Sequence, residues 1–179
     1  MDFKDYYNKE VKKAIMDELK LKNVMSVPRI VKVVINVGAG EAVSNKNVIE
    51  KIAEQIGIIS GQKPVITKAR KSVAAFKIRQ GLPIGVKVTL RGQNMYNFLE
   101  KLVKIVIPRL RDFRGISDST VDQNGNMSLG FSEQTVFPEI EFDTIDKLRG
   151  LEVTIVTNAG DKKIGRLLFE KLGIPFKKS

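Results

Sequence analysis

The sequence contains neither cysteine nor histidine among its 179 residues. The absence of cysteine excludes disulfide frameworks and zinc knuckles, and the absence of histidine excludes Ser-His and Cys-His catalysis. No apolar run reaches the ~20 residues that a helix needs to cross a bilayer. The opening stretch "MDFKDYYNKEVKK" also lacks the apolar core of a signal peptide. We therefore expect a soluble, cytoplasmic protein with no membrane span.

Negative charge is missing from a long segment in the middle of the chain. The formal net charge is +11, which favours a polyanionic partner. Between Glu54 and Glu100 there is no acidic residue, and the interval holds eight basic ones: Lys63, Lys68, Arg70, Lys71, Lys77, Arg79, Lys87 and Arg91. From Asp112 to Glu152 the balance reverses, with nine acids against three bases. This segregation indicates two different partners on two regions, with ordinary charge clustering as the simpler alternative.

Apolar periodicity predicts the secondary structure. Helices are expected over residues 3–20, 44–59, 94–107 and 161–172, with Pro108 ending the third. The predicted apolar face of the first comprises Tyr7, Val11, Ile15 and Leu19, and that of the second comprises Val48, Ile49, Ile52 and Ile56. Strands are expected over residues 27–37, 63–67, 83–92, 126–131 and 151–157. In the third strand apolar residues alternate with Lys87, Thr89 and Arg91, so one face is buried and a basic face stays open.

These elements predict an α+β fold in a single domain over residues 1–179. We expect a mostly antiparallel sheet of about five strands, with helices packed on one face. Two long irregular excursions, residues 60–85 and 110–147, are rich in Gly, Ser, Asp, Asn or basic residues. Function concentrates in such segments.

Enzyme chemistry finds little support. The stretch "VVINVGAGEAV" supplies Gly38 and Gly40 of a dinucleotide-binding pattern, but Val43 stands at the third glycine position and Glu41 would repel a pyrophosphate. The acids of "FPEIEFDTID" alternate along the chain, which could suggest a metal site. A solvated strand or loop edge explains the same pattern better. We therefore expect no enzyme activity, no cofactor, no metal and no small-molecule substrate.

The segment "SGQKPVITKARKSVAAFKIRQGLPIG" is typical of nucleic-acid binding. Its Lys and Arg residues can contact phosphates, while Gln, Thr and Ser add hydrogen bonds. Gly61, Gly81 and Gly85 permit a close backbone approach. Phe76 can either stack on a base or pack internally. Charge alone leaves DNA, RNA and anionic membranes open as partners.

Part of this segment, "IGIISGQKPVITKARKS", resembles the signature of the L-five family of large-subunit ribosomal proteins. The likeness continues in "VAAFKIRQGLPIGVKVTLRG", "FLEKLVKIVIPRLRDFRGIS", "NMSLGFSEQTVFPEI", "GLEVTIVTNAGD" and "LLFEKLGIPFKK", so it spans almost the full length. The bacterial form is the most similar. The resemblance implies a constituent of the 50S central protuberance that binds 5S rRNA, within an RNA-binding core of about residues 24–92.

The resemblance also implies site residues. The Asn-Val-Gly of the family matches residues 36–38 here. The 5S rRNA surface is predicted to comprise Asn36, Gly38, Gln62, Lys63, Thr67, Lys68, Arg70, Lys71, Ser72, Lys87, Thr89 and Arg91. A loop at the elbow of peptidyl-site tRNA is predicted to comprise Ala74, Ala75, Phe76, Lys77, Ile78, Arg79, Gln80 and Gly81.

The acidic excursion, about residues 109–147, is predicted to bridge to a basic protein of the small-subunit head. Its contact residues are predicted to be Arg111, Asp112, Arg114, Asp118 and Asp143, with the two arginines alternatively holding large-subunit RNA. The other expected partners are 23S rRNA and neighbouring central-protuberance proteins. A free-standing RNA-binding regulator and an enzyme acting on nucleic acid are the competing functions.

Overall fold

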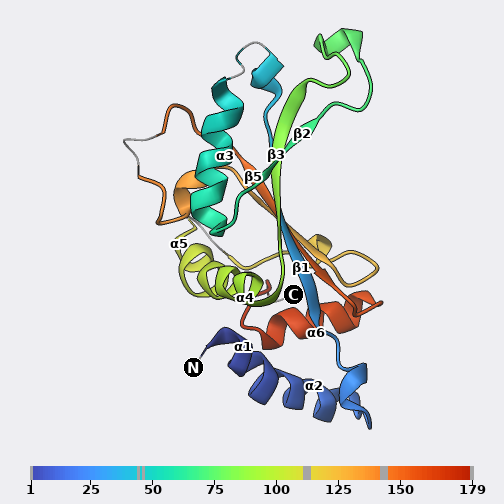
Figure 1. The fold of residues 1–179 in the computed structure, drawn as a ribbon. Coiled ribbons are helices and arrows are strands. Elements are labelled where there is room, and N and C mark those ends of the chain that lie inside the picture. The colour runs from blue at the N-terminus through green and yellow to red at the C-terminus, as the bar shows by residue number, and fades with distance from the viewer. Residues whose placement is uncertain (1, 44, 46, 111–113, 142–144, 178–179) are drawn as a thin grey trace. The chain divides into compact units, whose positions relative to one another are not determined.

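The computed structural model describes residues 2–43, 45, 47–110, 114–141 and 145–177. Within these ranges five strands form one sheet in the order β2-β3-β1-β5-β4 (Figure 1). The strands are β1 (Ile30–Gly38), β2 (Val65–Lys68), β3 (Pro83–Leu90), β4 (Met127–Phe131) and β5 (Leu151–Thr157). The α+β class and the five-stranded antiparallel sheet are therefore confirmed.

The helices lie where the periodicity predicted them, with two interruptions. They are α1 (Phe3–Tyr6), α2 (Lys12–Leu19), α3 (Asn47–Ser60), α4 (Gly92–Lys101), α5 (Ile107–Arg109) and α6 (Lys162–Lys171). A π-helical turn, Tyr7–Val11, joins α1 to α2, and a second, Leu102–Val106, joins α4 to α5. No helix in the described ranges combines the length and the apolar character needed to span a bilayer.

The expectation that Pro108 ends the third helix is wrong. Pro108 lies inside α5, which continues to Arg109. The backbone becomes extended at the next residue, Leu110. A proline ring clashes with the carbonyl group four residues earlier and cannot donate a backbone hydrogen bond. The π-helical turn Leu102–Val106 ends two residues before the proline, and its wider hydrogen-bonding pattern accommodates this defect without breaking the helix.

The described chain divides into two compact units. The first comprises residues 1–33, 91–129 and 154–179, and the second comprises residues 34–90 and 130–153. Strands β1, β4 and β5 each have residues in both units, whereas β2 and β3 belong to the second.

The first unit is built on the amphipathic N-terminal helices. Tyr7, Val11 and Ile15, spaced by four, are buried as the sequence predicted. Helix α1 contacts α4, and α2 contacts α6. The Tyr7 hydroxyl donates a hydrogen bond of 2.9 Å to the Pro28 carbonyl, and burial raises the pKa of Tyr7 above its ordinary value. This bond ties the helices to the segment that enters β1.

The second unit is built on α3 and the β2–β3 hairpin. The predicted apolar stripe of α3 is buried, and the helix contacts both β3 and β2. On β3, Val86, Val88 and Leu90 are buried. Each such side chain contributes about 1.5–3 kcal/mol when fully buried. Their burial leaves the alternate residues of β3 on the opposite face.

Gly85 lies at a point of close backbone approach in this unit. A Cβ atom there would stand 2.8 Å from Thr67 Oγ1 and 2.9 Å from the Val37 carbonyl oxygen. We predict that Gly85→Ala lowers the free energy of unfolding by about 1–3 kcal/mol, because a backbone atom must move to admit the methyl group. Gly130→Ala is the control, since nothing lies within 4 Å of its added Cβ. Equal urea denaturation midpoints for the two variants would contradict the prediction.

Candidate nucleic-acid interface

A polar face lies opposite the buried face of β1 and β3. On β1, Val33, Ile35 and Val37 are buried, whereas Asn36 and Gly38 are exposed. On β3, Lys87 is exposed and Thr89 is half-buried between buried apolar neighbours. Because successive side chains of a strand point to opposite faces, each strand turns these polar residues away from the core. The predicted open face is therefore present.

Strand β2 adds residues to the same face. It pairs antiparallel with β3, with Val65 opposite Lys87 and Thr67 opposite Gly85. Cross-strand partners point to the same side of a sheet. Thr67 therefore lies on the side of Lys87, and Val65 contributes an exposed apolar surface beside that lysine.

Gln62 is held next to this face by internal hydrogen bonds. Its side-chain amide nitrogen donates to the Thr89 carbonyl oxygen at 3.2 Å. Its backbone N–H and carbonyl both bond to the Ser60 hydroxyl, which also donates to the Ile56 carbonyl at the end of α3. Gln62 and Thr89, which were both predicted to belong to the 5S rRNA surface, are therefore neighbours in the structure.

Several of the predicted cations have no carboxylate partner in the described chain, and Lys87 among them lies on this face. Among the described residues, no carboxylate lies within 4.0 Å of the charged nitrogens of five of them, all exposed: Lys63, Lys68, Arg70, Lys71 and Lys87. Arg91 is also exposed, but it precedes α4 and belongs to the first unit. Unpaired lysine and arginine side chains are the groups that phosphates bind.

The predicted tRNA loop is an ordered hairpin, which corrects the expectation of an irregular excursion (Figure 1). Backbone hydrogen bonds join Ala69 to Leu82 at its base, and they join Val73 to Ile78 in both directions near its tip. Phe76 lies in the 3-10 turn at the tip and is 71% exposed. Internal packing of Phe76, one of the two open alternatives, is therefore excluded for the described chain.

Only part of the predicted small-subunit contact can be placed. Arg111, Asp112 and Asp143 lie outside the described residues. Arg114 is exposed. Asp118 accepts a hydrogen bond of 2.8 Å from Arg166, so its carboxylate already has an internal cationic partner.

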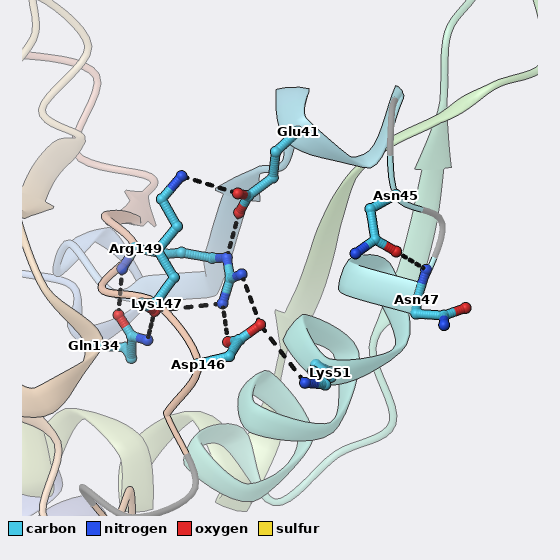
Figure 2. A network of polar contacts seen from close by, with 8 residues as sticks. All are labelled: Glu41, Asn45, Asn47, Lys51, Gln134, Asp146, Lys147 and Arg149. Atoms are coloured by element: carbon cyan, nitrogen blue, oxygen red, sulfur yellow. Dashed lines mark hydrogen bonds and ion pairs between the residues drawn. The ribbon is translucent and has the colours of Figure 1, made fainter.

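A buried arginine, which the sequence patterns did not indicate, organises the second unit (Figure 2). The Arg149 side chain is only 8% exposed. Its Nε donates to Glu41 at 2.6 Å, and its two terminal nitrogens donate to the two oxygens of Asp146 at 2.7 and 3.1 Å. Lys147 bonds to the other oxygen of Glu41 at 2.9 Å. Gln134 accepts from the Arg149 backbone N–H and donates to the Lys147 carbonyl.

This network favours the charged forms of Asp146, Glu41 and Arg149. Hydrogen bonds from Arg149 lower the pKa of Asp146 to about 2. Hydrogen bonds from Lys147 and Arg149 lower the pKa of Glu41, and the bond to Asp146 raises the pKa of Arg149. Glu41 lies in the 3-10 turn Gly40–Val43 that follows β1, and its carboxylate accepts hydrogen bonds from Lys147 and Arg149. This internal role of Glu41 argues further against a dinucleotide site at Gly38 and Gly40. The described residues contain no group of three or more potential metal ligands.

The geometry defines a class of protein: an α+β protein whose open strand face is polar and basic, with no carboxylate of the described chain paired to its cations. Two family models match the chain, one for "Ribosomal protein L5" over residues 23–79 and one for the C-terminus of the same ribosomal family over residues 83–176. The chain therefore belongs to the ribosomal protein L5 family, as the sequence motifs predicted. Membership of a family of ribosomal proteins also confirms that the chain is not an enzyme.

Curated relatives agree with the family models. The chain is 55% identical over 174 residues to a protein of Roseiflexus sp. (strain RS-1), covering 97% of both chains. It is 55% identical to a protein of Psychrobacter sp. (strain PRwf-1), covering 97% of this chain and 98% of the relative. It is 54% identical to a protein of Chloroflexus aggregans, covering 97% of both chains. All three are named large ribosomal subunit protein uL5.

Arg149→Met tests the buried network, because methionine keeps much of the aliphatic stem but removes the charge. We predict a loss of about 2–3 kcal/mol in the free energy of unfolding. This is less than the ~3–5 kcal/mol of a fully buried pair, since the carboxylates are 30% exposed and solvent screens them. Lys147→Met is the control, and because Lys147 is 63% exposed it should cost less than about 1 kcal/mol.

The same comparison has a defined pH dependence. The pKa of Asp146 falls on folding from 3.8 to about 2, so its contribution is complete above pH about 4 and is lost as the pH falls toward 2. The stability difference between wild type and Arg149→Met should therefore narrow over that interval. A difference that stayed constant down to pH 2 would show that Arg149 stabilises the unit through packing alone.

Proposed function

We propose that this chain is a structural constituent of the large ribosomal subunit, where it binds 5S rRNA and attaches it to the central protuberance. The observation that carries the proposal is the open face in the second unit, which presents Asn36, Lys87 and Thr89. The same unit exposes Lys63, Lys68, Arg70 and Lys71, which pair with no described carboxylate. The names of the relatives support a place in the large subunit. Contacts with 23S rRNA and with neighbouring central-protuberance proteins follow from the family resemblance.

The surface suits the recognition of RNA through its backbone. Lysine and arginine bind phosphates, and the amide and hydroxyl groups of Asn36, Gln62 and Thr89 can bond to sugars or base edges. A Cβ atom added at Gly38 would meet nothing within 4 Å, and Gly38 does not adopt a positive φ. Since neither packing nor conformation within the described chain requires glycine there, the space above it favours close approach of an RNA backbone.

The hairpin at residues 69–82 is proposed to contact the elbow of peptidyl-site tRNA. Its tip presents an exposed ring at Phe76 and an exposed cation at Lys77, whose left-handed backbone (φ 54°) sharpens the turn. A small contact of this kind suits a ligand that must leave in each cycle. An ordered hairpin loses less conformational entropy on binding than a flexible loop would.

The contact with a basic protein of the small-subunit head is proposed on the excursion at residues 109–147. The excess of acids there, which repel phosphate, supports a protein partner. Asp118 is a poor probe of this contact, because reversing its charge would also break its internal pair with Arg166. Among the predicted contact residues, Arg114 is described and exposed, and it provides the cleaner probe.

Neutralising Lys68, Arg70 and Lys71 together to glutamine tests the 5S rRNA surface. Each phosphate contact adds about 0.7–0.9 to the slope of log affinity against log salt, so the slope should fall by about 2–3. Filter binding of purified 5S rRNA over a range of salt concentrations measures it. The exposed residues Lys9, Lys13 and Lys163 serve as a matched triple control. An unchanged slope and affinity would remove this segment from the interface, and absence of the protein from high-salt 50S particles would favour a free-standing regulator.

Shortening the hairpin tests the tRNA contact. Replacing residues 74–77 by Asn-Gly keeps the Val73–Ile78 pairing, because Asn-Gly forms the two-residue turn that hairpins prefer. We expect unchanged folding and 5S rRNA binding but faster dissociation of tRNA from the peptidyl site. The cysteine-free chain also allows a crosslinker at Lys77→Cys. Unchanged tRNA retention, or crosslinks that reach only rRNA, would contradict the assignment.

A further inference from the structure

An exposed apolar turn lies between α2 and β1 in the first unit. Residues Val24–Ser26 form a 3-10 turn, with Met25 79% exposed and Val24 54% exposed. Large apolar side chains that gain nothing from internal packing at such a position indicate a contact with something outside the chain when they stand together. Both residues fall at the start of the RNA-binding core expected over about residues 24–92, but neither is among the contact residues named above.

The turn is held rigidly. The Asn23 side chain accepts a hydrogen bond of 2.9 Å from the Met25 N–H, and the Asn23 carbonyl accepts one of 3.0 Å from the Ser26 N–H. On the far side Val27 is buried, and the next carbonyl, that of Pro28, accepts the Tyr7 hydroxyl. The two apolar side chains are therefore presented on a preformed support, which lowers the entropy cost of binding.

The charges beside the turn select the partner. No acidic residue occurs between Glu18 and Glu41, and Glu18 itself pairs with Lys171 at 2.7 Å. The interval carries four cations, of which Lys20, Lys22 and Arg29 are exposed and Lys32 is half-buried. Exposed cations that flank an apolar turn on both sides in the sequence match a polyanion that also offers apolar surface. RNA has this chemistry, because its unstacked bases and riboses lie next to phosphates.

We propose that Val24 and Met25 form an apolar wedge that packs against an unstacked base or ribose of ribosomal RNA, with Lys20, Lys22 and Arg29 on the adjacent phosphates. Proteins insert methionine and aliphatic side chains between bases in this way. The proposal rests on the proposed function for the class of partner. The wedge is an additional RNA contact, and it lies in the first unit. The RNA contacts proposed at residues 62–72 and on the open face of β3 lie in the second unit.

Directed cleavage locates the wedge. Because the chain has no cysteine, Met25→Cys, Lys63→Cys and Asn8→Cys each carry a single hydroxyl-radical probe in reconstituted 50S subunits. We expect cuts from position 25 that the exposed control position 8 does not produce, and primer extension of 5S and 23S rRNA identifies which RNA carries them. Cuts from position 63 without specific cuts from position 25 overturn the wedge alone. Cleavage of proteins only, without cleavage of RNA, also overturns the wedge. If none of the three variants enters the subunit, both the wedge and the proposed function are overturned.

Substitution separates the apolar contact from the ionic one. Met25→Ser should weaken binding to large subunits stripped of this protein about tenfold, because it removes the burial of one apolar side chain, and it should leave the salt slope unchanged. Met25→Leu should retain binding. Lys20→Gln, Lys22→Gln and Arg29→Gln together should lower the slope by about 2. Because Met25 is exposed, the thermal midpoint of Met25→Ser should match wild type, and equal binding by the serine and leucine variants would refute the wedge.

Discussion

The bidentate pairing of Arg149 with Asp146, extended by its bond to Glu41, is the interaction on which the second unit depends. It joins residues that lie 108 positions apart in the sequence, and thereby ties residues 146–149 to the turn that follows β1. An arginine this deeply buried requires both carboxylates, since a charge without partners would cost several kcal/mol. Gln134 completes the arrangement by bonding the backbone on both sides of Leu148, at the Lys147 carbonyl and the Arg149 N–H.

This pairing bears directly on the open face that we propose to bind RNA. Glu41 lies in the 3-10 turn Gly40–Val43, which begins two residues after the end of β1, and Asn36 lies within the last three residues of that strand. Lys51 of α3 reaches the same Asp146 at 3.7 Å. The turn, the helix and the returning segment are thus held by one cluster of charges (Figure 2). Preorganised groups bind more tightly than mobile ones, because less freedom is lost on association.

The sequence predicted what depends on local pattern. Alternation along β3 identified Lys87 and Thr89 as the open face, and the four-residue spacing of Tyr7, Val11 and Ile15 identified a buried helix face. The hydrogen-bonded form of the 69–82 hairpin was missed, because basic residues and glycines resemble a loop until the Val73–Ile78 pairing is seen. Arg149 was missed for a different reason, since no periodicity links residues 41 and 149.

The structure also changes the meaning of the charge segregation. Within the acidic region, Asp146 is engaged by Arg149, Asp118 by Arg166, and Asp122 accepts backbone N–H groups of its own turn. Much of that negative charge therefore stabilises the fold. The cations of residues 63–71 are engaged by no described carboxylate. The two halves of the charge pattern are consequently unequal as functional signals: the cations of residues 63–71 stay available to an external partner, whereas several carboxylates of the acidic half are paired inside the protein.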